Sequence, residues 1–185
     1  EIRKAGKILY IGCSTMPAYK FAQLLTLAEC KGYARPIAMQ NLYNLIQRDE
    51  EREMIPLCVD AGVGLIPYSP LARGVLAGNR VGGGVGETER AKYDKGLKTG
   101  ASLFRDSDKE VVATVISIAK KYDIKPTQVA LSWILKNPAV VSPIIGATKL
   151  SHISDAISAV DIELSMDDMK DLERPYQSRE SPLNI

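Results

Sequence analysis

Short apolar runs alternate with helical patterns along most of this chain, and this order constrains the fold more than any other feature. Four runs have the length and composition of buried parallel strands, and they cover residues 7–12, 37–41, 63–67 and 140–145. Strands that alternate with helices predict an α/β protein with a parallel sheet. An open doubly wound sheet and part of a barrel both satisfy this pattern, and periodicity does not choose between them.

The expected helices have recognisable start and stop signals. Pro17 opens a pattern in which apolar residues recur at helical spacing, and Gly32 ends it. A charged amphipathic helix is expected over 48–61, with Gly62 at its end. Later helices are expected to start at 106 or 107, near 126, at 151 and after Ser165, the last ending before Pro175. Pro143 indicates that strand pairing weakens in the fourth apolar run.

A long segment over 73–105 interrupts the alternation. It is rich in glycine and charge, so we expect a long loop of the kind that often carries function. Its glycine run over 82–86 follows no strand and opens no helix, unlike the dinucleotide fingerprint of doubly wound sheets. We expect one domain over 1–176 and a loose tail over 177–185.

Composition excludes several classes of function. The 24 basic and 22 acidic residues are mixed along the 185-residue chain, without the basic stripe that a nucleic-acid partner requires. No apolar run reaches the roughly 18 residues of a membrane span, and no signal peptide opens the chain. Cys13, Cys30 and Cys58 lie in apolar patterns without metal-ligand spacing. We therefore expect buried reduced thiols, no metal and a cytoplasmic location.

The first seven residues look like the end of a helix, with Gly6 as its stop signal, and they include no methionine. We therefore expect that further chain precedes them.

Polar stretches follow the four apolar runs and carry a resemblance to a known family. They read Gly12-Cys13-Ser14-Thr15-Met16, Met39-Gln40-Asn41-Leu42-Tyr43-Asn44, Leu65-Ile66-Pro67-Tyr68-Ser69-Pro70-Leu71-Ala72-Arg73-Gly74 and Ile145-Gly146-Ala147-Thr148-Lys149. In order and spacing they resemble the fifth to eighth strand ends of the aldo-keto reductases. The resemblance covers nearly the whole chain and implies the C-terminal half, about four βα units, of a (β/α)₈ barrel of the TIM type. It also implies NADP(H) bound in extended form across the C-terminal strand ends.

The resemblance implies roles for four residues at the nicotinamide end. Ser14 and Gln40 would hydrogen-bond the carboxamide, and Tyr68 would stack on the ring. Thr15 stands where the family commonly has Asn, which puts a third contact in doubt. Apart from the resemblance, Ser14 and Thr15 are equally suited to cap the helix that Pro17 opens. Tyr68 could equally be an aromatic residue packed at a strand end.

The remaining cofactor residues follow from the same resemblance. Ser69, the backbone around Leu71, and Arg73 would contact the pyrophosphate. Lys149 and His152 would lie near the adenosine 2′-phosphate, where cations favour NADP over NAD, and Asp155 would accept from the adenine amine. Lys149 and His152 also fit ordinary solvated surface positions.

The proton-transfer residues of the family have no counterpart here. A tyrosine, a lysine, an aspartate and a histidine come from the first four strands in that family, and this chain begins after them. His152, the only histidine, is placed at the adenosine end by its spacing. Tyr19, Tyr33, Tyr43 and Tyr93 have no lysine–aspartate pair nearby in the sequence. No catalytic residue is therefore expected in this chain.

The resemblance implies an NADP(H)-binding half of an enzyme that transfers hydride from NADPH to a small aldehyde or ketone. Four strands would leave two open edges and an apolar inner face, so the missing N-terminal half or a second copy is expected to cover them. A stand-alone half barrel, perhaps a homodimer, that binds a dinucleotide or hydrophobic ligand or acts as a scaffold is the alternative. A half barrel recruited to non-redox chemistry is a third reading.

Overall fold

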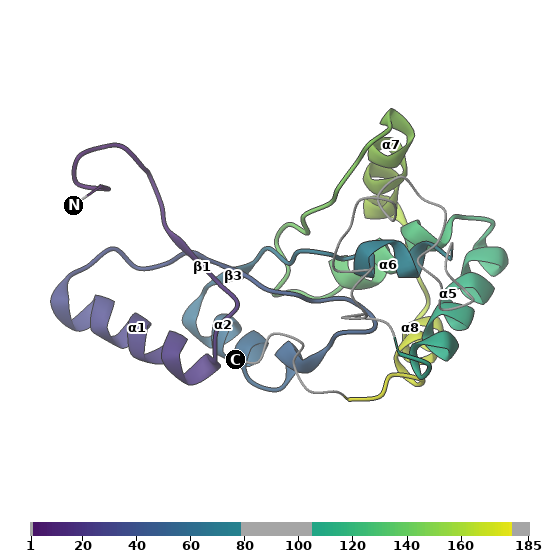
Figure 1. Ribbon diagram of the computed structural model, residues 1–185, viewed down its shortest axis with the longest axis horizontal. Coiled ribbons are helices and arrows are strands. Elements are labelled where there is room, and N and C mark those ends of the chain that lie inside the picture. The colour runs from purple at the N-terminus through teal and green to yellow at the C-terminus, as the bar shows by residue number, and fades with distance from the viewer. Residues whose placement is uncertain (1, 79–104, 179–185) are drawn as a thin grey trace.

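The computed structural model describes residues 2–78 and 105–178, and it has the predicted α/β class (Figure 1). Three short strands, β1 (Gly12–Ser14), β2 (Ala38–Gln40) and β3 (Gly64–Leu65), form a parallel sheet in the order β1-β2-β3. Ser14 pairs with Gln40, and Met39 pairs with both Cys13 and Leu65. β2 and β3 lie within their apolar runs. The first prediction is wrong in its bounds: β1 starts only at Gly12, the last residue of the run over 7–12, and extends to Ser14, while Leu9 and Tyr10 are exposed.

The fourth apolar run lies beside β3 but forms no strand of its own. It makes two isolated parallel bridges, Leu65 with Val140 and Tyr68 with Ile144. Pro143 lies between the two bridging residues and has no N–H to donate, which explains the interrupted ladder. Among the described residues, three strands make a sheet and no barrel closes, so the predicted four-stranded half barrel is not confirmed.

The two faces of the sheet differ in character. Met39 and Leu65 are fully buried against the helices. The opposite face carries Gly12, Ala38 and Gly64, followed by Ser14 and Gln40, because side chains alternate along a strand. Over these three strands the second face therefore carries small and polar side chains, which differs from the apolar inner face expected from the sequence.

Gly64 sets the spacing between β3 and the segment that follows α6. A Cβ at this position would lie 2.9 Å from Cγ2 of Val141. The backbone N–H of Val141 donates to Leu65 O at 2.9 Å, which holds the two segments at this distance. The β-branched side chain of Val141 has little rotamer freedom with which to move aside.

Two helices pack against the buried face of the sheet. α1 (Ala18–Lys31) begins after Pro17, as predicted, and buries Phe21, Leu25 and Ala28, which recur at helical spacing. α2 (Met54–Ala61) buries Met54, Ile55 and Cys58. Both helices end at a glycine with positive φ, Gly32 and Gly62, as the sequence indicates.

The second half of the described chain is helical. α5 (Asp108–Tyr122), α6 (Pro126–Leu135) and α8 (Met166–Glu173) pack together beyond the sheet (Figure 1). α6 starts at Pro126 and α8 ends before Pro175, as predicted, and α6 ends just ahead of Asn137-Pro138. Ser165 caps α8, because its hydroxyl accepts from the Asp168 N–H at 3.2 Å.

α7 (Leu150–Ser158), followed by the 3₁₀ turn η3 (Ala159–Asp161), presents an apolar face to solvent. Leu150 is 84% exposed, and three further apolar residues on the same face are exposed: Ile153, Ile157 and Val160. No helix of the described residues is long and apolar enough to cross a bilayer.

Two further local predictions are wrong. The helix expected over 48–61 is split, with a 3₁₀ turn η1 (Asp49–Glu51) before α2. At the expected helix end, by contrast, Gly6 has φ +70°, and the Gly6 and Lys7 N–H groups donate to Arg3 O and Ile2 O, the pattern that ends a helix at a glycine. The second wrong prediction concerns the thiols. Cys30 is exposed on α1, whereas Cys58 is buried and Cys13 half-buried, and all three are free thiols.

Much of the long segment over 73–105 lies outside the described residues, including the glycine run, Tyr93 and everything from 79 to 104. Its first residues belong to η2 (Ala72–Ala77), in which two 3₁₀ turns meet at a kink. Of the tail over 177–185, only residues 177 and 178 are described.

Candidate functional site

Polar side chains meet where the parallel strands end. Ser14 and Gln40 are ladder partners at the C-terminal ends of β1 and β2. Two residues beyond Gln40, Leu42 bridges to Tyr68, which in turn bridges to Ile144. The strand ends therefore place Ser14, Gln40 and Tyr68 along one edge of the sheet, the edge at which open and closed α/β folds bind ligands.

The hydroxyls of Ser14 and Thr15 both donate to the backbone carbonyl of Gln40, at 3.1 and 3.4 Å. The Thr15 N–H donates to the same carbonyl at 3.1 Å. Pro17 occupies the N-cap of α1, and no side chain caps that helix. Ser14 and Thr15 are thus tied to β2 and do not serve the capping role that the sequence left open.

The chain after Tyr68 makes a sharp turn in which several residues have positive φ, a backbone conformation that residues other than glycine rarely adopt. Ser69, Ala72 and Arg73 have φ values of 53°, 48° and 56°, and Gly74 follows at 93°. Positive φ in residues with a Cβ costs about 1–3 kcal/mol each and recurs at ligand-binding loops. Residues 69–74, called here the strained loop, begin directly beside Tyr68.

Asn44 supports this loop from the segment after β2. Its Nδ2 donates to Ser69 O at 2.9 Å, and its Oδ1 accepts from the Ile46 N–H at 3.0 Å. Asn44 is not among the site residues predicted from the sequence. Nothing local indicates its role, because its partner Ser69 is 25 residues away.

The three residues expected at the adenosine end lie on and before α7. Lys149 is exposed at the N-cap position, and the exposed His152 accepts a 3.4 Å hydrogen bond at Nδ1 from the Thr148 N–H. Asp155 accepts from Lys125 Nζ at 2.7 Å, so this carboxylate already pairs with a cation of α6. Lys149 and His152 share one short stretch of surface, and Asp155 faces α6.

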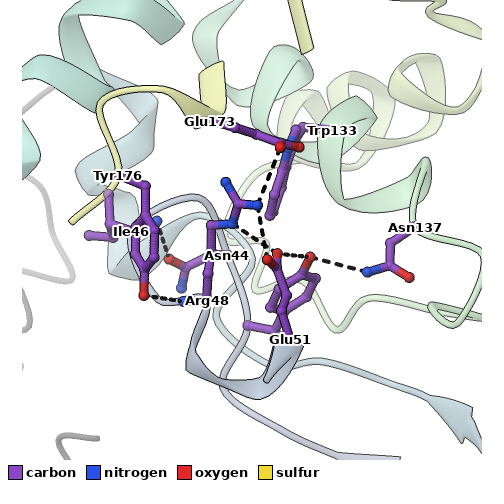
Figure 2. Close-up of polar contacts among 9 residues, drawn as sticks. Asn44, Ile46, Arg48, Glu51, Trp133, Asn137, Glu173 and Tyr176 are labelled. Atoms are coloured by element: carbon purple, nitrogen blue, oxygen red, sulfur yellow. Dashed lines mark hydrogen bonds and ion pairs between the residues drawn. The ribbon is translucent and has the colours of Figure 1, made fainter. Parts of the chain in front are cut away.

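A second polar cluster forms around Arg48, in the segment between β2 and α2, and it connects elements of the fold. Arg48 donates to both carboxylate oxygens of Glu51 at 2.8 and 2.9 Å and pairs with Glu173 at 3.3 Å (Figure 2). Its guanidinium carbon is 5.3 Å from the ring centres of both Trp133 and Tyr176. The cluster joins η1, α6 and the segment after α8.

Three groups outside the strand ends have raised pKa values. Burial raises the pKa of the Glu50 carboxyl in η1. Burial and the charge of Glu50 raise the pKa of Cys58 to about 11, and burial also raises the pKa of Tyr43. Cys58 and Tyr43 belong to the hydrophobic core.

A tyrosine, a lysine and an aspartate do come together, at the contact between α5 and α8. Tyr122 Oη donates to Asp168 Oδ2 at 2.7 Å, and Lys121 Nζ lies 2.8 Å from Oδ1. Tyr122 Oη also accepts from the Ser165 N–H, which starts α8. This group forms part of the N-terminal cap of α8 and joins it to α5.

Other candidate sites are weak. No group of three His, Cys, Asp or Glu side chains within residues 2–78 and 105–178 could hold a metal ion. A shallow pocket of 280 Å³ is lined by Arg3, Tyr10, Tyr33 and Arg35 among others, at the N-terminal ends of β1 and β2. It lies at the opposite sheet edge from Ser14 and Gln40.

The fold and the row of strand-end residues define an α/β protein with polar side chains gathered at the carboxyl edge of its parallel sheet. A model of the aldo/keto reductase family matches residues 1–176. The chain belongs to this family, whose members generally use a nicotinamide dinucleotide.

Several fungal proteins are similar to this chain. It is 44% identical over 176 residues to a Schizosaccharomyces pombe protein provisionally named an aryl-alcohol dehydrogenase, covering 95% of the chain and 48% of that relative. It is 39% identical over 180 residues to versiconal hemiacetal acetate reductase of Aspergillus parasiticus, covering 95% and 50%. An aldo-keto reductase of Metarhizium robertsii is 38% identical over 179 residues, covering 95% and 46%. The chain thus spans about half the length of these curated relatives.

Proposed function

We propose that this chain forms the NADP(H)-binding part of a reductase that acts on a small aldehyde or ketone. The observation that carries the proposal is the alignment of Ser14, Gln40 and Tyr68 along one sheet edge. When bound, the cofactor would supply a hydride to the carbonyl carbon. The residues of this chain would bind and orient it.

The site residues fit the chemistry of a nicotinamide dinucleotide. A carboxamide needs a donor and an acceptor, and Ser14 and the Gln40 amide offer both beside each other. The partly exposed ring of Tyr68 would stack on the nicotinamide and fix the face presented to the substrate. Thr15, tied to Gln40 O, would support the strand end rather than contact the ring.

The phosphate groups would lie further along the same edge. Ser69, the backbone at Leu71, and Arg73 lie in the strained loop, and turns with successive residues at positive φ are a known way to build an anion site from backbone groups. Lys149 and His152 would face the 2′-phosphate. Asp155 would reach the adenine amine only by sharing or leaving its ion pair with Lys125.

We propose further that the chain is a half barrel of the TIM type. Four consecutive strands of such a barrel are parallel neighbours in chain order. The same order is found here for β1, β2, β3 and the segment over 140–144. The carbonyl oxygen must receive a proton as the hydride arrives. We infer that its donor, with the lysine, aspartate and histidine that tune it, comes from the half of the relatives that this chain does not match.

A complementing half, or a second copy of the chain, would cover the exposed apolar residues. The face of α7 that includes Leu150 and Ile157, together with Val141 beside β3, is the surface that such a partner would bury. The names of the relatives make aryl aldehydes reasonable first substrates for the complete protein.

The test is a fluorescence titration of NADPH with this chain, with its mass in solution measured in the same sample. Tyr68→Ala should weaken binding by about fivefold, since ring stacking is worth roughly 1 kcal/mol. Tyr33→Ala removes an exposed tyrosine at the other sheet edge and should leave affinity unchanged. Equal affinity of the chain and the Tyr68→Ala variant would contradict the assigned site.

A further inference from the structure

We propose that Asn44 is a positioning residue, which holds the strained loop in the shape needed to bind the cofactor pyrophosphate. The inference rests on the proposed function for its purpose. The structural claim is that the buried Asn44 amide maintains the loop. This claim rests on the hydrogen bonds alone and has its own test.

Asn44 is only 2% exposed, and its amide is used at both ends. Oδ1 accepts from the N–H of Ile46, which can only donate, and Nδ2 donates to the carbonyl of Ser69, which can only accept. These two backbone partners fix the orientation of the amide, so the hydrogen-bond pattern admits no flipped alternative.

The carbonyl that Asn44 holds is the first one of the strained loop. Ser69 O receives two donors, Asn44 Nδ2 at 2.9 Å and the Ala72 N–H at 2.9 Å. The second bond closes the turn that places Ala72 and Arg73 at positive φ. Residues with a Cβ keep a positive φ only where surrounding contacts hold the backbone in place. For the strained loop, a described contact of this kind is the hydrogen bond from the Asn44 side chain to Ser69 O.

Asn44 can serve as a support because its own segment is anchored on both sides. The backbones of Asn44 and Gln47 exchange hydrogen bonds of 3.1 and 3.0 Å in an antiparallel bridge. The next residue, Arg48, donates its backbone N–H to Tyr176 Oη at 3.3 Å and places its side chain in the cluster of Figure 2. The turn over 44–48 therefore joins the strained loop to α6 and to the segment after α8.

The test compares Asn44→Asp with Asn137→Asp. An aspartate at 44 keeps the acceptor for Ile46 but places a second oxygen against Ser69 O. Asn137 is a matched control, because its Oδ1 also accepts from the N–H two residues on, in Ala139, and its Nδ2 donates to a distant oxygen, Tyr43 Oη. Both variants lose one long-range donor, but only the first loses a bond to the strained loop.

The structural readout is hydrogen exchange, followed by mass spectrometry of peptides covering 68–76. Asn44→Asp should speed exchange of the Ala72 and Gly74 amides by about tenfold, the effect of losing one buried hydrogen bond. Asn137→Asp should leave these amides unchanged relative to other peptides. Equal exchange in the two variants would overturn the positioning role, whether or not the chain binds a dinucleotide.

The functional readout is affinity for NADPH and for reduced nicotinamide mononucleotide, which lacks the pyrophosphate bridge and adenosine. Asn44→Asp should weaken NADPH binding by about tenfold and leave mononucleotide binding unchanged. Equal loss for both ligands would overturn the specific role in pyrophosphate binding. Altered exchange in a chain that binds neither ligand would instead contradict the proposed function and leave the structural support by Asn44 established.

Discussion

The guanidinium carbon of Arg48 lies 5.3 Å from the ring centre of Trp133, so a cation that follows the second strand is stacked on the indole of α6. Trp133 Nε1 donates to Glu173 at 3.0 Å, and Glu173 pairs with Arg48, which closes the group. This arrangement holds η1, α6 and the end of α8 in one unit. Its integrity should therefore be visible in the stability of the whole chain.

Replacing Arg48 by Ala should lower the free energy of unfolding by about 2 kcal/mol, because Glu51 and Glu173 lose their cation and two rings lose a stacked group. Arg48→Lys should recover only part of this loss, since an ammonium cannot bind a carboxylate through two nitrogens. Urea unfolding checks both values. Lys109→Ala, which removes an exposed ion pair with Asp106, should hardly shift the midpoint. Full stability in Arg48→Lys would mean that charge alone holds the cluster.

Asp168 should make the stability of the chain sensitive to acid. Hydrogen bonds from Lys121, Ser165 and Tyr122 lower its pKa to about 2 in the folded state, from near 4 in an unfolded chain. A lowered folded pKa contributes stability above pH 4 that is lost as the pH falls through about 2. Urea unfolding between pH 6 and 2 should thus show a steeper decline for the native chain than for Asp168→Asn.

The neighbouring Asp167 supplies the control for this pH dependence. Its carboxylate is exposed, 3.6 Å from Lys170 on the surface of α8. Asp167→Asn should leave the acid dependence of the native chain in place. Identical pH profiles for the native chain and Asp168→Asn would contradict the assignment.

The three thiols should react in a fixed order. Cys30 is exposed, whereas Cys58 is buried and its pKa is raised to about 11 by burial and by Glu50. Burial raises the pKa of Cys13 as well. Iodoacetamide at pH 8 should alkylate Cys30 first and leave Cys58 intact until the chain unfolds, because only the thiolate reacts. Peptide mass spectrometry follows each site, and comparable rates at Cys30 and Cys58 would refute the predicted order.

Lys149 should determine the choice between the two dinucleotides. Replacing this exposed lysine by Glu should weaken NADP(H) binding by about tenfold and leave NAD(H) nearly unaffected, since only the former has a 2′-phosphate. Calorimetric titration of both ligands measures the ratio. Lys136→Glu, at the far end of α6, makes the same change of charge and should alter neither affinity. Parallel loss of both ligands in Lys149→Glu would place the phosphate elsewhere.

Periodicity and terminal residues predict the helices of this fold apart from the start of α2. Pro17 and Gly32 bound α1, and Pro126 begins α6, because proline and glycine act on the backbone locally whatever packs around them. The strand ends were also predictable in order. The family resemblance rests on them, and it is confirmed by the match over residues 1–176.

What the sequence could not predict depends on contacts between distant residues. The helical pattern over 48–61 fails at its start, where Arg48 instead joins the cluster with Trp133 and Tyr176. Asn44 reads as an ordinary residue near a strand end until Ser69 is placed beside it. The roles assigned to Ser14, Gln40 and Tyr68 stay predictions, and their common edge is what makes them testable.

Gly64 has a consequence for mutational scanning of this chain. The residue is neither apolar nor deeply buried, and its φ is ordinary, so filters based on exposure or backbone angle would class it as tolerant. Any side chain there meets Val141, and the first carbon already lies too close. A saturation library should therefore be depleted at position 64, alanine included, but less than at a core leucine, because Val141 is 63% exposed and is not enclosed by the core.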